Sequence, residues 1–112
     1  MKHVESTCRG PATVVRLKGP LVDEVLDELS QHATSAISAG VGRVVFDASE
    51  IPFADSQGIE LLLDVADQLG TIGQPMRFAS ISETLREIFE ITGVADRFDY
   101  YEDVPQAVRS LS

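Results

Sequence analysis

The sequence predicts an α/β fold, with four or five mostly parallel strands, an N-terminal antiparallel hairpin and about four packed helices. Three observations predict it. Strand-like and helix-like segments alternate along the chain, and this alternation requires crossover connections between parallel strands. The segment GRVVFD (42–47) carries a short unbroken apolar run, which is typical of a strand buried on both faces. Gly-Pro pairs and single glycines separate the segments.

The first part of the chain predicts a hairpin followed by a helix. A weak strand over 3–9 and an alternating strand over 12–18 are joined by Gly10-Pro11. Apolar residues at helical spacing then predict a helix over 22–39, with acidic residues in its first turns and Gly40 after its end.

The second part continues the alternation. Ser80 and Glu83 have the spacing of a capping box ahead of an apolar helical pattern. The expected elements are a strand over 42–47, a loop over 48–54, a helix over 56–69, a strand over 76–79, a helix ending before Gly93, a strand over 99–101 and a helix over 104–111.

Length, composition and charge limit the classes of protein to which this chain can belong. The 112 residues suit one domain, which we expect to span 1–112, and a hydrophobic fraction of 44% can fill one core. Nine basic and 18 acidic residues give a net charge of −9, which disfavours nucleic-acid binding and attachment to anionic lipid and fits a soluble partner with a basic surface. With Cys8 alone, no internal disulfide can form, and neither a signal segment nor a membrane span is visible. We therefore expect a cytoplasmic location.

The junction FADSQG (53–58) raises the functional question. Asp55 is a good helix N-cap, Ser56 falls in the first helical turn, and Gly58 leaves room for something to approach the backbone. Ordinary capping explains the Asp-Ser pair, but a nucleophile or a hydroxyl modified by a partner are alternatives. A phosphate on Ser56 would be favoured by the positive end of the helix and repelled by Asp55.

Catalytic, metal and cofactor sites are not expected. A nucleophilic serine needs an oriented base, but His3 lies in a terminal strand, His32 lies off the apolar stripe of its helix, and residues 54–58 lack the G-x-S-x-G pattern. Asp47 ends a central strand, where a phosphoacceptor aspartate would lie. Such a site also needs an acidic pair on an earlier strand to hold Mg²⁺, but Glu5 is the sole acid that the earlier strands offer. Too few Cys and His residues are present for a metal site, and a phosphate-binding glycine loop with lysine is missing.

The helix over 56–69 has apolar positions beyond those that a single buried face requires. Leu61 and Val65 lie one turn apart and off the predicted core stripe, so they are candidate docking anchors. Single apolar residues on a surface are also ordinary, and this alternative stays open. The predicted core stripe is Ile59, Leu62, Leu63, Ala66 and Leu69.

The stretch VVFDASEIPFADSQGIELLL (44–63) resembles the signature of STAS domains, in particular the bacterial anti-sigma factor antagonists. Three other stretches, VVRLKGPL, ISETLREIFEITGVADRF and DVPQAVRSL, resemble further elements of the family in the same order, so the resemblance covers nearly the whole chain. Two departures are Gln57, where the family usually has Ser or Thr, and Asp23, which lies one place later than the family's acidic residue.

The resemblance implies a STAS fold and a regulatory switch without enzymatic activity. In the family, the unphosphorylated antagonist binds an anti-sigma factor that is also a serine kinase, phosphorylation on the serine releases it, and a serine phosphatase restores it. Carried over, Ser56 is the phosphorylated residue, and the protein is a monomer or weak dimer. An alternative is a STAS scaffold in a lipid-transport ATPase or a stress-signalling complex. The expected partner-binding residues are Asp23, Asp55, Gln57, Gly58, Leu61 and Val65.

Overall fold

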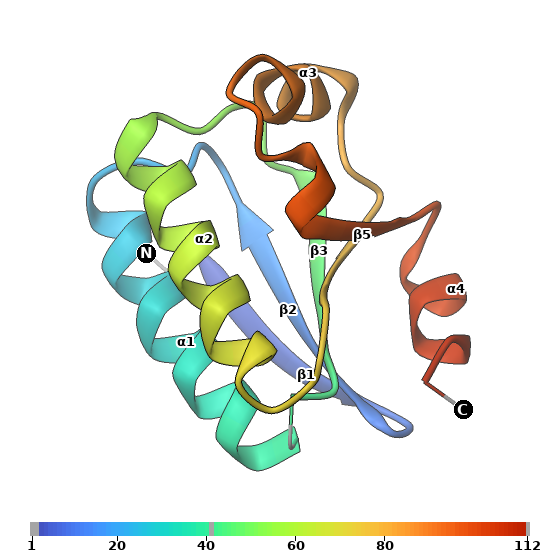
Figure 1. Ribbon diagram of the computed structural model, residues 1–112. Helices are drawn as coiled ribbons and strands as arrows, with labels where there is room; N and C mark the ends of the chain where they lie inside the picture. The colour runs from blue at the N-terminus through green and yellow to red at the C-terminus, as the bar shows by residue number, and fades with distance from the viewer. Residues whose placement is uncertain (1–2, 41, 112) are drawn as a thin grey trace.

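Five strands form one sheet in the order β1-β2-β3-β4-β5 (Figure 1). The computed structural model describes residues 3–40 and 42–111. β1 and β2 pair antiparallel and the other neighbours pair parallel, which confirms the predicted mixed sheet. The elements are β1 (Val4–Arg9), β2 (Ala12–Lys18), α1 (Glu24–Gly40), β3 (Val44–Glu50), α2 (Ser56–Gly70), β4 (Met76–Ala79), α3 (Glu83–Ile91), the 3₁₀ turn η1 (Ala95–Arg97), β5 (Phe98–Tyr101) and α4 (Val104–Arg109).

Helices bury both faces of the sheet to different extents. α1, α2 and α3 contribute to a large core on one face, whereas α4 alone covers a smaller cluster on the other face (Figure 1). In β3, Val44 and Phe46 belong to the large core and Val45 belongs to the small one. The unbroken apolar run of this strand is therefore explained by burial on both faces, as predicted.

Four phenylalanines fill the middle of the large core. The rings of Phe46, Phe78, Phe89 and Phe98 come from three strands and α3, and their neighbouring centroids lie 5.0–5.9 Å apart. Tilted and edge-to-face contacts at this spacing are favourable aromatic arrangements. A chain without tryptophan thus concentrates its few aromatic rings where strands and helices meet.

Some element boundaries differ from the prediction. α1 begins at Glu24 rather than at residue 22, because Asp23 has a φ of 50° and cannot belong to a right-handed helix. β3 continues to Glu50, so the loop that precedes α2 is three residues shorter than predicted. β5 begins one residue earlier and α4 ends two residues earlier than expected. These shifts leave the order and type of the elements unchanged.

The predicted capping box at the start of α3 is wrong. The N-cap is Ser82, whose Oγ accepts a hydrogen bond of 3.2 Å from the backbone N–H of Leu85. Ser80 has a φ of 58°, and its hydroxyl donates to the carbonyl of Glu102 instead. Ser80 therefore joins the end of β4 to the segment after β5.

Over residues 3–40 and 42–111, no helix combines sufficient length with sufficient apolar character to cross a bilayer.

Candidate functional site

The Ser56 junction lies where two loops meet at the carboxyl ends of β2 and β3. Leu21 and Ala54 form an isolated parallel bridge between these loops. The Leu21 N–H donates to the Phe53 carbonyl at 3.0 Å, and the Asp55 N–H donates to the Leu21 carbonyl at 3.4 Å. Backbone hydrogen bonds therefore fix the segment before α1 beside the segment before α2.

Asp55 caps α2, as the sequence predicts. Its backbone is extended, with a φ of −86° and a ψ of −176°, and its Oδ1 accepts a hydrogen bond of 2.8 Å from the Gly58 N–H. A side-chain acceptor at this position satisfies one of the free N–H groups of the first turn, and its negative charge faces the positive end of the helix. Asp55 thus has a structural role whatever else it contacts.

Gly58 is buried, and the room beside it is already filled. A Cβ added at this position would lie 2.5 Å from the Leu21 carbonyl oxygen and 3.3 Å from the Cβ of Ala54. The expected close approach to the backbone at Gly58 is therefore confirmed, and the approaching group is the Leu21 carbonyl of the same chain. The glycine lets the loop before α1 pack directly on the first turn of α2.

Ser56 and Gln57 are exposed on the outer side of that turn. Both histidine rings have side-chain partners other than the Ser56 hydroxyl. His3 Nδ1 lies 3.2 Å from Glu28 Oε1, and His32 Nδ1 lies 2.8 Å from the hydroxyl of Ser6, so both rings are held between β1 and α1. Over the described residues, no group of three or more His, Cys, Asp or Glu could hold a metal ion.

The surface around the Ser56 hydroxyl combines negative charge with one exposed aromatic ring. Phe53 is 46% exposed, and Asp23 is exposed in the neighbouring loop. We call the exposed residues Asp23, Phe53, Asp55, Ser56 and Gln57 the Ser56 face. Sequence analysis did not name Phe53 as a binding residue, although an aromatic side chain in the short loop before α2, directly after Pro52, is a signal that could have done so.

The two candidate docking anchors on α2 do not form an exposed pair. Val65 is 1% exposed and belongs to the large core, and Leu61 is half-buried against that core. The prediction that this pair lies off the core stripe is wrong, because the buried face of α2 is centred nearer to Val65 than the sequence pattern indicates. The fully buried residues of α2 are Gly58, Ile59, Leu62, Val65 and Leu69.

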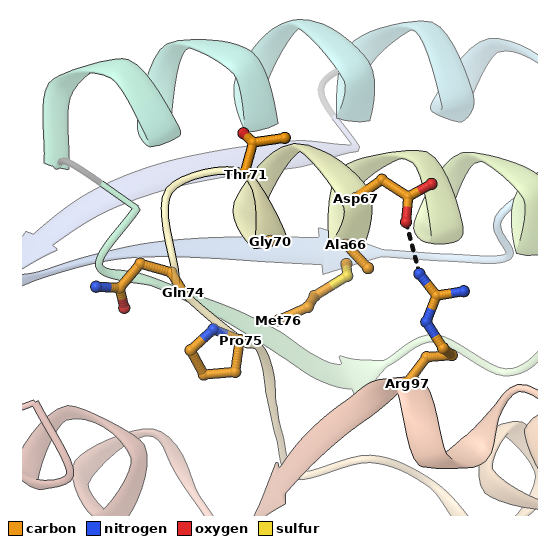
Figure 2. Close-up of a pocket in the computed structure, with 8 residues that line it drawn as sticks. All are labelled: Ala66, Asp67, Gly70, Thr71, Gln74, Pro75, Met76 and Arg97. Carbon is orange, nitrogen blue, oxygen red and sulfur yellow. Dashed lines mark hydrogen bonds and ion pairs between the residues drawn. The ribbon is translucent and has the colours of Figure 1, made fainter.

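A pocket of about 490 Å³ lies at the other end of α2 (Figure 2). An ion pair between Arg97 Nη2 and Asp67 Oδ1, 2.6 Å long, spans it, so its two charged groups neutralise one another. The pocket is remote from Ser56. Its lining residues are Ala66, Asp67, Gly70, Thr71, Gln74, Pro75, Met76 and Arg97.

Comparison with known proteins places this geometry in a family. The STAS domain family model matches residues 3–107. BtrV of Bordetella bronchiseptica, a candidate anti-sigma factor antagonist, is 27% identical over 82 residues, which are 73% of this chain and 71% of BtrV. An anti-sigma-factor antagonist (STAS) domain protein from Planctomyces limnophilus has the same fold, with a TM-score of 0.85, 18% identity and coverage of 100% of this chain and 99% of that chain.

The anti-sigma factor antagonist SpoIIAA of Bacillus has the same fold in two chemical states. Its unphosphorylated form gives a TM-score of 0.76 at 19% identity, covering 96% of this chain and 95% of that chain. Its phosphorylated form gives a TM-score of 0.71 at 18% identity, covering 97% of this chain and 99% of that chain. Because the family model spans nearly all of the sequence and the fold agrees with it, the chain belongs to the STAS domain family.

Proposed function

We propose that this protein is an anti-sigma factor antagonist that is switched by phosphorylation of Ser56. Unphosphorylated, it binds an anti-sigma factor that is also a serine kinase and so frees a sigma factor for transcription. Phosphorylated on Ser56, it releases that partner, and a serine phosphatase resets it. The observation that carries the proposal is the exposed Ser56 hydroxyl at the first turn of α2, within a STAS fold.

The names of the relatives support a binding role. BtrV, the Planctomyces protein and SpoIIAA are all named as anti-sigma factor antagonists, and SpoIIAA is known in phosphorylated and unphosphorylated forms. A role in binding rather than catalysis also agrees with the hydrogen bonds that pair His3 with Glu28 and His32 with Ser6 rather than with Ser56. On this proposal the chain acts as one STAS domain over 1–112, in the cytoplasm, without a cofactor or nucleic acid, as a monomer or weak dimer.

The switch is electrostatic. A phosphoserine adds about −1.5 to −2 charges at neutral pH. At Ser56 this charge would lie beside the carboxylates of Asp55 and Asp23 on the Ser56 face. The positive end of α2 lowers the cost to the fold, so the charge changes the docking surface without requiring the core to move.

The partner must complement both features of the Ser56 face. An apolar cavity would accept Phe53, and a cationic group would pair with Asp23 or Asp55. Gln57 adds an uncharged donor and acceptor beside Ser56. A phosphate on Ser56 would place a dianion where this partner packs against the uncharged hydroxyl and the amide of Gln57, and the cost of desolvating that dianion would weaken the complex.

The test is phosphorylation by the kinase recovered with the protein from its host. Incubation with this kinase and ATP should add one phosphate to Ser56, detected by intact-mass and peptide mass spectrometry, and Ser56→Ala should remove it. Ser30→Ala, a change at an exposed serine of α1, is the matched control and should be phosphorylated normally. Phosphate on another residue would reject the assignment, and recovery of a transport ATPase instead of a kinase would favour the scaffold alternative.

A further inference from the structure

The cationic side chains of the described residues fall into two groups. Four of them form ion pairs of 2.6–3.7 Å: Arg16 with Glu50, Lys18 with Glu5, Arg86 with Glu90 and Arg97 with Asp67. The other four, Arg9, Arg43, Arg77 and Arg109, form no ion pair with any described acidic residue. Unpaired arginines are unexpected in a chain with a net charge of −9.

Three of the unpaired arginines lie at one end of the sheet. Arg9 ends β1 and pairs in register with Ala12 at the start of β2, and the Arg43 carbonyl accepts a hydrogen bond of 2.9 Å from the Thr13 N–H. Arg109 is the last residue of α4. Figure 1 shows the β1–β2 turn and the end of α4 at the end of the sheet opposite the start of α2. This positive end is therefore remote from the Ser56 face.

Arg9 and Arg109 line the same pocket. It has a volume of about 460 Å³ between the β1–β2 turn and α4, and no acidic residue lines it. Its walls also contain the apolar surfaces of Pro105 and Val108. We call it the hairpin–α4 pocket, and its full lining is Cys8, Arg9, Gly10, Pro105, Val108 and Arg109.

Arg77 adds positive charge to the same side of the sheet. It is 7% exposed, and its Nε and Nη1 have no hydrogen-bond partner among the described residues, while Nη2 donates to Gln74. Its register neighbours are Val45, which packs with α4 residues, and Asp99, an exposed acid on β5. A buried cation without an ion pair costs free energy, and an anion bound nearby would offset part of that cost.

We propose that the hairpin–α4 pocket binds a short anionic peptide segment of a second protein. Carboxylate or phosphate oxygens of that segment pair with Arg9 and Arg109, and one of its apolar side chains covers Pro105 and Val108. The planar guanidinium group presents two parallel donors that suit either oxyanion. The site lies away from Ser56, so this partner and the one proposed above bind without competing.

Charge and size favour a peptide over a nucleic acid. At physiological ionic strength, charges act over about 8–10 Å, so a short segment in the pocket senses the arginines more than the distant acidic residues. A long polyanion would also meet the negative remainder of a chain with net charge −9. The pocket is too large for a single ion and has apolar walls that a side chain would cover.

The test is a titration of the ¹⁵N-labelled 112-residue protein, followed by amide chemical shifts. The probes are a blocked glutamate- and leucine-containing hexapeptide, its phosphoserine analogue, its neutral glutamine analogue and a single-stranded oligonucleotide. Saturable shifts around Arg9, Gly10, Val108 and Arg109 are expected with the first two. Binding of the glutamine peptide should be at least about tenfold weaker, because it lacks the charge that pairs with arginine.

Substitutions locate the site. Arg9→Gln and Arg109→Gln should each weaken binding by about two- to fivefold. Arg86→Gln, a change at an exposed arginine of α3, should leave binding unchanged. The proposal is overturned by an absence of saturable shifts, by shifts centred on Ser56, by an equal loss in the Arg86 variant, or by oligonucleotide binding tighter than that of both anionic peptides. Unchanged amide spectra of the free variants show that they fold.

Discussion

The Cα of Gly58 faces the Leu21 carbonyl oxygen so closely that an added Cβ would lie 2.5 Å from that oxygen. The contact joins the first turn of α2 to the loop before α1. The Asp55 N–H donates to the same carbonyl at 3.4 Å. One carbonyl group therefore organises both loops of the Ser56 face, and Gly58 is the residue that allows it to come close.

Gly58→Ala should destabilise the protein by about 1–3 kcal/mol, because the methyl group meets a backbone oxygen that cannot rotate away. Urea unfolding followed by circular dichroism measures the loss. Gly70→Ala is the matched control, since a Cβ there meets nothing within 4 Å and the residue is the last of α2. That change should be neutral or stabilise by up to about 1 kcal/mol. Equal destabilisation by both would show that the contact with Leu21 is unimportant.

Asp55→Ala should lower the free energy of unfolding by about 0.5–2 kcal/mol, the usual contribution of a helix N-cap. The cause is the loss of the 2.8 Å hydrogen bond from the Gly58 N–H to the carboxylate. Asp55→Asn keeps an acceptor oxygen at the cap but removes the charge, so its stability should stay close to that of the wild type. Comparing the partner affinity of the Asn variant with that of the wild type then isolates the charge of Asp55. A cap role is contradicted if Ala and Asn are equally destabilising.

The fold was predictable because the order of apolar and polar residues within each segment follows from which side chains are buried. The run VVF in β3 is apolar on both faces, and the Met76–Ala79 strand has the predicted bounds. The cap at Asp55 was predictable because it depends on four consecutive residues. Local signals of this kind do not require knowledge of how distant segments pack.

Other features depend on contacts between distant segments and were not predictable in this way. The space beside Gly58 is filled by Leu21, which is 37 positions earlier in the chain. Val65 is buried because of how α2 is rotated against the sheet, which a helical pattern rich in leucine on several sides does not determine. At α3, Ser80 has the acidic residue that a capping box requires, but the N-cap is Ser82, because the Ser80 hydroxyl donates a hydrogen bond to the Glu102 carbonyl.

Phe53→Ala should weaken binding of the anti-sigma factor by about tenfold or more, because exposed aromatic rings at the centre of an interface often supply about 2 kcal/mol or more. Isothermal titration calorimetry with the recovered partner measures the change. Ile72→Ala is a closely matched control, since Ile72 is also 46% exposed but lies after the end of α2, remote from Ser56. Its affinity should equal that of the wild type. A similar loss in both variants, or none in the Phe53 variant, would place the docking surface elsewhere.

Glu28 should make the protein less stable as the solution becomes acidic. The backbone N–H of His3 donates to its carboxylate at 2.8 Å, and this bond holds the pKa of Glu28 below its usual value of 4.5 despite an opposing effect of desolvation. The His3 ring, at 3.2 Å, and the Val4 N–H act in the same direction. Because the folded state favours the charged carboxylate, its contribution is complete above the unfolded pKa and is lost as the pH falls through the lower, folded value.

The measurement is the thermal midpoint of wild type and Glu28→Gln between about pH 3 and pH 7. The amide of glutamine can still accept from His3 but does not titrate, so the variant should lose less stability than the wild type below about pH 4.5. Glu87→Gln, a change at an exposed glutamate of α3, is the control and should follow the wild-type curve. Since the Glu28 bonds attach the start of β1 to α1, acid should also lower the protection factor of the Val4 amide, which is its exchange rate compared with the intrinsic rate at the same pH, in the wild type but not in the Glu28→Gln variant. If the thermal midpoints of the wild type and Glu28→Gln fall by the same amount as the pH is lowered, the attachment of β1 to α1 does not depend on the charge of Glu28.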